Sequence, residues 1–408
     1  MALFHKFTLG FDGRLRRRDV TAVAVATVAV VLIASWWLGR PERRLAEAAE
    51  ALARSDFERA RALLPLAEAT PRTRDRALAI RARSAIELGR FAEAARALDA
   101  INPSGPLAIT VGLLRGRVLY QTGRIPLATV WFRWVIERSP GDLDAHRRLA
   151  AACYDQGDRP SAISALEHVT QIDPKDARAW RTLALLYKED VDYERAEPAY
   201  EATLRLDPAQ PSVRFERAET LLKLGRFNLA HAELSTCRGK VPEADRVVLE
   251  SRCLHLGGEE AARREAIGRA LADHPDHPGL LAQRAEIDVE DGKFTDALAR
   301  LDRSIRADPF ESERVYQRAT VLRVLGRTEE AARDHARAAE LNRGLATMER
   351  LNDQAARSPD DPHVRCRLGG LCVDLGKRDL AASWYRAALA CDPNDTEARS
   401  GLSGLGVR

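Results

Sequence analysis

The chain has 408 residues and a formal net charge of +4, with 30% charged and 6% aromatic residues. It is too long for one ordinary hydrophobic core, so we expect it to be divided into several packed parts. Residues 1–19 hold five basic and two acidic residues, and the nearly neutral remainder argues against bulk binding of nucleic acid. The alanine, arginine and leucine content predicts mostly helix, and the excess of arginine over lysine suggests a bacterial coding bias.

An uncharged stretch at residues 20–38 follows the basic N-terminus. As a helix that rises about 1.5 Å per residue, it would span roughly 28 Å, which is close to the thickness of a bilayer core. Trp36 and Trp37 stand at its far end, where indole rings favour the membrane interface. We therefore predict a transmembrane helix at 20–38, with residues 1–19 in the cytoplasm. A cleaved signal peptide and the reverse orientation are the alternatives.

Prolines recur at a fixed interval through the rest of the chain. Pro140, Pro174, Pro208 and Pro242 are each 34 residues apart, and a series of glycines that begins at Gly123 follows a similar interval. A period of about 20–50 residues is typical of stacked repeats, in which each unit contacts only its neighbours. The period therefore predicts a stacked array that offers a surface for binding partners. It does not indicate a pocket for catalysis.

Two units, 177–210 and 362–395, show the pattern within a repeat most clearly. Apolar residues at the fourth, seventh, eighth and eleventh positions form one stripe of a first helix, and small residues allow a second helix to pack closely. Glycine would end the first helix in a left-handed conformation, and Asp-Pro would end the second. The residues that carry the pattern are Trp180, Leu183, Ala184, Tyr187, Ala196, Tyr200, Pro208, Gly369, Gly376, Ala381, Tyr385, Ala388 and Pro393.

This pattern resembles the tetratricopeptide repeat, a helix–turn–helix unit of 34 residues. Ten such units begin near residues 41, 75, 109, 143, 177, 211, 243, 278, 312 and 362. The resemblance implies an all-α, right-handed α-solenoid that follows the one transmembrane helix. Ser55 and Val191 stand where glycine is usual, so the turn at Val191 is uncertain by one residue. Gly257 is assigned to the corresponding turn of the unit at 243.

The repeats divide into an array of about nine units at 41–342 and a last unit with a C-terminal cap at 362–408. Between them, we expect Gly344 to end the second helix of the preceding unit. An extra linking helix is then expected within 343–361, where it offsets the last unit. This segment could instead bend the superhelix or contact a partner.

No motif in the sequence supports catalysis. Glycine-rich phosphate loops, HExxH and GxSxG are absent, and the repeats leave no room for a catalytic domain. We therefore predict that the chain is not an enzyme and that it uses no cofactor and no metal. His274 and His277 flank a proline in a turn between repeats, where we expect solvated side chains. Cys366 and Cys391 could approach each other across the two helices of one unit, so a disulfide between them is possible.

Arginine recurs at the seventh position of five units, where the family prefers leucine. These residues are Arg81, Arg115, Arg217, Arg284 and Arg318. We interpret them as aliphatic stems that pack between helices while their guanidinium groups reach water.

In tetratricopeptide arrays the first helices line a concave face, and by this resemblance the third to fifth units present a basic stripe with two tyrosines. We expect it to bind an acidic segment of a protein, or an anionic polymer, through bidentate arginine contacts. The candidate partner-binding residues are Arg117, Tyr120, Arg147, Arg148, Tyr154, Arg178, Arg181 and Lys188. The alternative is that arginine is abundant throughout and that these side chains are merely solvated.

The sequence thus predicts a membrane-anchored protein–protein interaction scaffold or adaptor of the bacterial cell envelope, with its array in the periplasm. Its partners would be other proteins and not nucleic acid. An alternative is the binding of an anionic glycan, or an accessory role in exopolysaccharide synthesis or export, although few aromatic residues line the expected groove. An enzyme is the remaining alternative and is the least supported by the residues.

Overall fold

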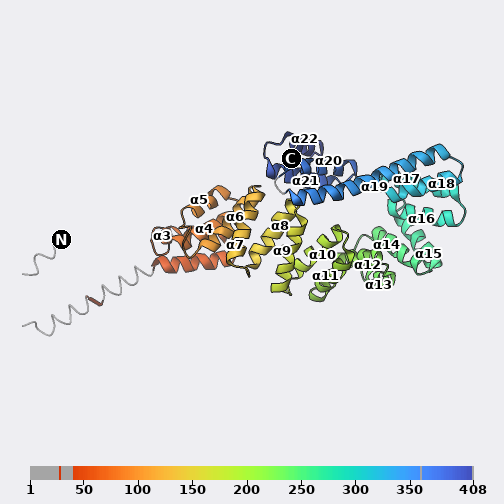
Figure 1. Ribbon diagram of the computed structural model, residues 1–408. Coiled ribbons are helices and arrows are strands. Elements are labelled where there is room, and N and C mark those ends of the chain that lie inside the picture. Colours follow the sequence, from red (N-terminus) through yellow and green to blue (C-terminus); the bar gives the residue numbers. More distant parts are fainter. Residues whose placement is uncertain (1–26, 29–39, 359–360, 407–408) are drawn as a thin grey trace, which may run out of the picture. The chain divides into compact units, whose positions relative to one another are not determined.

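The computed structural model describes residues 27–28, 40–358 and 361–406. The regular structure of these residues is helical, and they contain no strand (Figure 1). Nearly all of the predicted transmembrane stretch at 20–38 lies outside the described residues. In the ranges that the structure does describe, none of the helices combines the length and the apolar character that a membrane span requires. The chain divides into two compact units, and the boundary follows Gln121.

The first unit contains two repeats and one further helix. Its helical segments are residues 40–53, α2 (Phe57–Ala62), α3 (Pro65–Glu68), α4 (Arg74–Glu87), α5 (Phe91–Asp99) and α6 (Ala108–Gln121). Leu45, Ala48 and Leu64 pack with Ala77 in a buried cluster that joins the first repeat to the second. The small residues let these helices approach closely, as the repeat pattern predicted.

The second unit continues the series of helix–turn–helix pairs. Its helices are α7 (Ile125–Arg138), α8 (Leu143–Asp155), α9 (Arg159–Ile172), α10 (Ala177–Glu189), α11 (Tyr193–Leu206), α12 (Pro211–Lys223), α13 (Phe227–Thr236), α14 (Glu243–Leu256), α15 (Glu260–Asp273), α16 (Pro278–Glu290), α17 (Phe294–Ala307), α18 (Ser312–Val324), α19 (Thr328–Arg357), α20 (Pro362–Asp374), α21 (Arg378–Cys391) and α22 (Thr396–Gly404). The signature residues Leu183, Ala184 and Tyr200 are buried, as a repeat core requires.

The turn inside each repeat requires one residue in the left-handed conformation. Gly123 and Gly376 take φ values of 77° and 71° there, which glycine adopts without a steric penalty. The prediction for Gly257 is wrong, because α14 continues to Leu256 and Gly258 carries the positive φ instead. Val191 keeps the turn in register with a φ of 60°, a conformation that costs a β-branched residue about 1–2 kcal/mol.

The prediction that Gly344 ends a helix is also wrong. Helix α19 runs without a break through Gly344 and ends at Arg357 (Figure 1). A Cβ atom at Gly344 would lie 2.8 Å from Cδ2 of Leu375, so glycine permits close packing against the end of α20. The predicted linking helix is therefore the second half of α19. Leu351 and Ala355 in that half pack into the core of the last repeat.

We predicted that the guanidinium groups at the seventh position reach water. This prediction is wrong, because they form ion pairs inside the array. Arg217 contacts Glu197 at 2.5 Å and Glu233 at 2.7 Å, with 17% of its side chain exposed. Arg318 makes an equivalent pair of contacts with carboxylates of two neighbouring second helices. The reason is that the second helices on either side place acidic residues beside the same arginine. The low exposure there strengthens charge-assisted hydrogen bonds.

Candidate functional site

A cavity of about 530 Å³ lies between the first helices α8 and α10 of two successive repeats. Its apolar lining includes Ala150, Ala179 and Leu186, and its polar lining includes Arg147, Tyr154, Asp176 and Arg178. The structure therefore brings together three of the predicted partner-binding residues, Arg147, Tyr154 and Arg178. A cleft of this size lies in the range typical of ligand sites, about 300–1,000 Å³. We call this cavity the central groove.

The cations of the central groove differ in how far they are neutralised. Arg147 contacts Asp176 at 2.6 Å, and Asp176 also caps α10 by accepting from the backbone N–H groups of Arg178 and Ala179. Burial raises the pKa of Asp176, but the backbone hydrogen bonds and Arg147 outweigh this effect and hold it below its usual value. Among the residues that the structure describes, no carboxylate lies within ion-pair distance of the exposed Arg178. Arg178 is thus the cation of the groove that is available to a ligand.

Tyr154 supplies the aromatic surface of the central groove. Its side chain is 43% exposed, and its hydroxyl donates to Glu189 over 3.3 Å. Burial and the negative charge of Glu189 both raise the pKa of Tyr154, so it stays a neutral donor at physiological pH. Its ring can pack against an apolar group while the hydroxyl remains bonded.

Three other predicted residues form ion pairs within the array. Arg148 contacts Asp144 at 2.9 Å, Arg181 contacts Glu216 at 3.5 Å, and Lys188 contacts Glu219 at 2.5 Å. The last two pairs join α10 to α12, so much of the predicted positive charge is balanced inside the protein. The sequence contained this signal, because acids in the next repeat stand about one period after the cations.

The remaining candidates, Arg117 and Tyr120, lie on α6 in the first unit. Arg117 contacts Glu87 at 2.5 Å, and only 12% of its side chain is exposed. Tyr120 is half-buried. The central groove is formed by residues of the second unit alone.

The last repeat contributes to a second cavity, of about 540 Å³, that was not predicted from the sequence. Leu380, Trp384 and Ala387 of α21 line it together with residues that flank α7 and the end of α8. The ring of Trp384 packs directly on Gly157, and only 5% of this tryptophan is exposed. Gly157 combines a φ of 76° with no side chain, so it permits both the turn after α8 and this close approach.

A buried arginine strengthens the same contact. The guanidinium of Arg365, on α20, donates to the backbone carbonyl of Gln156 at the end of α8 and to that of Asp361 over 2.8 Å. The side chain is 0% exposed. A cation at the C-terminus of a helix is favoured by the helix dipole. Such long-range contacts between repeats leave no periodic signal in the sequence.

The candidates Cys366 and His277 make local structural contacts. Cys366 and Cys391 are not joined by a disulfide, and the Sγ atom of Cys366 donates to Asp395 over 3.5 Å. Burial, together with the nearby charge of Asp395, raises the pKa of Cys366 to about 12, so this thiol stays protonated. His277 accepts from the backbone N–H of Leu280 at the start of α16.

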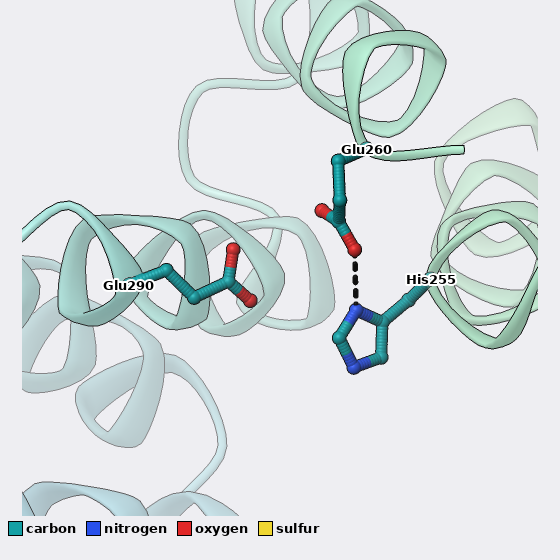
Figure 2. A group of neighbouring side chains, drawn as sticks. All are labelled: His255, Glu260 and Glu290. Atoms are coloured by element: carbon teal, nitrogen blue, oxygen red, sulfur yellow. Dashed lines mark hydrogen bonds and ion pairs between the residues drawn. The ribbon is translucent and has the colours of Figure 1, made fainter. Parts of the chain in front are cut away.

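His255, Glu260 and Glu290 are the nearest approach to a metal-ligand set among the described residues (Figure 2). The Nδ1 atom of His255 lies 2.7 Å from Glu260. The buried Arg263, however, contacts Glu290 at 2.7 Å and Glu260 at 3.1 Å, and lies 3.1 Å from the same His255 nitrogen. Its guanidinium already supplies the positive charge that a cation would bring, so we interpret the group as an ion-pair network.

Paired helices that pack in series within each unit define the chain as a helical repeat protein. A family model described as "Tetratricopeptide repeat" matches residues 119–186, and a second model with the same description matches 81–142, 181–236, 283–355 and 340–396. The chain belongs to the tetratricopeptide repeat family. Proteins of this family are generally scaffolds without enzymatic activity.

Similarity to individual proteins is partial. The chain is 28% identical over 112 residues to "Protein CTR9 homolog" of Arabidopsis thaliana, and 28% identical over 134 residues to "General transcriptional corepressor ssn6" of Schizosaccharomyces pombe. These matches cover 28% and 30% of this chain but only 10% and 12% of the two relatives.

The chain also has partial similarity to solved structures. A tetratricopeptide repeat protein from Parabacteroides merdae is 13% identical, with 61% of this chain and 98% of that chain covered at a TM-score of 0.38. The APC/C hetero-tetramer Cut9-Hcn1 is 14% identical, with 87% and 74% covered at a TM-score of 0.41.

Proposed function

We propose that this protein is an interaction scaffold whose central groove receives an acidic segment of a partner protein. The observation that carries the proposal is the cavity between α8 and α10, in which the unpaired Arg178 and the exposed Tyr154 stand over an apolar lining. Arginine binds carboxylates through two parallel hydrogen bonds, and tyrosine supplies contact area with little loss of side-chain entropy.

Mutagenesis of the central groove tests this role. We expect Arg178→Glu and Tyr154→Ala to reduce the recovery of cross-linked partner proteins by the full-length chain. Arg323→Glu, on the exposed surface of α18, is the matched control, because Arg323 has no ion pair among the described residues and lines neither cavity. An unchanged set of partners with both groove variants would exclude the central groove as the binding surface.

The proposal also includes attachment to a bacterial cytoplasmic membrane through residues 20–38, with the array in the periplasm. Its support is the uncharged stretch itself, which is preceded by arginines and has Trp36 and Trp37 at its far end. The full chain should stay with membranes after alkaline extraction, and Val30→Arg with Leu32→Arg should release it. A reporter that is active only in the periplasm, fused to the C-terminus, should give a signal. A silent but expressed fusion would overturn the orientation.

An anionic glycan would meet the same cation, but among the described residues Tyr154 is the single aromatic residue that lines the central groove. Protein recognition suits this lining better, since glycans are usually held against several aromatic faces. A scaffold role requires no catalysis, and we propose that the chain is not an enzyme. The partners would be proteins and not nucleic acid.

A further inference from the structure

The cavity beside Trp384 is a composite of widely separated segments. The residues that precede and begin α7, the end of α8 and one face of α21 line it together. We call this cavity the anchor pocket. Its apolar lining includes Ile125, Leu380, Trp384, Ala387 and Ala390, and its volume of about 540 Å³ is sufficient for a large apolar side chain.

Positive charge surrounds this apolar lining. Arg124 and Arg386 both line the pocket and are exposed, and neither has a carboxylate within ion-pair distance among the described residues. Arg159 also lines it, but this arginine contacts Asp190 at 3.1 Å and Glu189 at 3.5 Å. Asp155 also lines the pocket, but among the described lining residues the three arginines outnumber this carboxylate, so the lining carries an excess of positive charge that complements carboxylates.

The anchor pocket adjoins the central groove. Tyr154 and Asp155 line both cavities, so one ligand segment can extend from one into the other. Along this path, the three unpaired cations Arg386, Arg124 and Arg178 border apolar surface on both sides of Tyr154.

We propose that the anchor pocket binds an aromatic or large aliphatic side chain of the same acidic segment, and that flanking carboxylates pair with Arg124 and Arg386. This inference rests on the proposed function and adds the last repeat to the binding surface. A side chain buried in a desolvated pocket supplies most of the affinity of many interfaces, and the surrounding charges select the sequence. A partner segment without the apolar residue would bind to the central groove only weakly.

Fluorescence anisotropy with a fluorescein-labelled peptide tests the inference. The peptide contains a central leucine–tryptophan pair that is flanked by aspartates. Full-length protein should bind this peptide more tightly than peptides that have serine and glycine in place of the pair, or lysine in place of the aspartates. Arg386→Glu and Leu380→Ser should each weaken binding about tenfold. Arg323→Glu is the matched control and should leave the affinity unchanged. Circular dichroism of each variant should confirm that the fold is retained.

The outcomes separate this inference from the proposed function. If Arg178→Glu weakens binding but Arg386→Glu and Leu380→Ser do not, the anchor pocket is refuted while the central groove stands. Equal affinity for the peptides with and without the leucine–tryptophan pair would refute the anchor pocket as well. If Arg386→Glu weakens binding and Arg178→Glu does not, the anchor pocket stands without the central groove.

Discussion

Gly157 and Gly326 provide a matched pair that tests the contact between α8 and the last repeat. Both follow a first helix, with φ values of 76° and 77°. Nothing lies within 4 Å of a Cβ atom added at Gly326, whereas one added at Gly157 would overlap the ring of Trp384. Alanine should cost about 1–2 kcal/mol at either turn because of its backbone conformation. Only Gly157→Ala should also displace Trp384, at a further cost of about 1–3 kcal/mol.

Hydrogen exchange measured by mass spectrometry can separate the two costs, because it reports local opening free energies in a long array that need not unfold in one step. Gly157→Ala should accelerate exchange in peptides of α21 by roughly 5- to 150-fold, the range that corresponds to 1–3 kcal/mol. Gly326→Ala should accelerate exchange only around its own turn. Unchanged exchange in α21 with Gly157→Ala, or an equal change there with Gly326→Ala, would refute the packing of Trp384 on Gly157.

Three further predictions concern the backbone, the central groove and acid stability. Val191→Gly should raise the stability by about 1 kcal/mol and increase the melting temperature, because it relieves a φ of 60°; Val130→Gly, inside α7, should lower it. Asp176→Asn should keep the cap of α10 but release Arg147, so the acidic peptide should bind several-fold more tightly; weaker binding would contradict this account. Burial raises the pKa of Glu93, but hydrogen bonds from Arg61 and Arg81 outweigh it and hold this pKa below its usual value. A depressed folded-state pKa stabilises the protein above the ordinary glutamate value of about 4.3, and this contribution disappears as the pH falls through the folded pKa. Thermal melts should therefore show that Glu93→Gln reduces the loss of stability on acidification; an unchanged loss would contradict the assignment.

Features within one repeat could be predicted from the sequence. The period of the prolines located the repeats, and small residues such as Ala184 predicted where helices pack closely. Gly257 was misassigned because two consecutive glycines allow the helix to extend by one residue before the left-handed turn. Gly344 was misassigned because its packing against Leu375 accommodates a residue that is otherwise unfavourable in a helix.

Contacts between repeats were harder to predict. The basic stripe was inferred from cations alone, while partners such as Glu216 and Glu219 stand on the next first helix. The packing of Trp384 on Gly157 joins residues that are far apart in the chain, and it depends on the offset that the long α19 produces. No single period in the sequence encodes such an offset.

Site-specific photo-cross-linking in cells tests the central claim most directly. A benzoylphenylalanine at Tyr154, which lines the central groove, should cross-link to a protein, and adding Arg178→Glu should abolish the product. The same group at Leu229, an exposed residue of the second helix α13, should give no such product. An identical product from Leu229, or a product from Tyr154 that survives Arg178→Glu, would contradict binding of an acidic partner segment in the central groove.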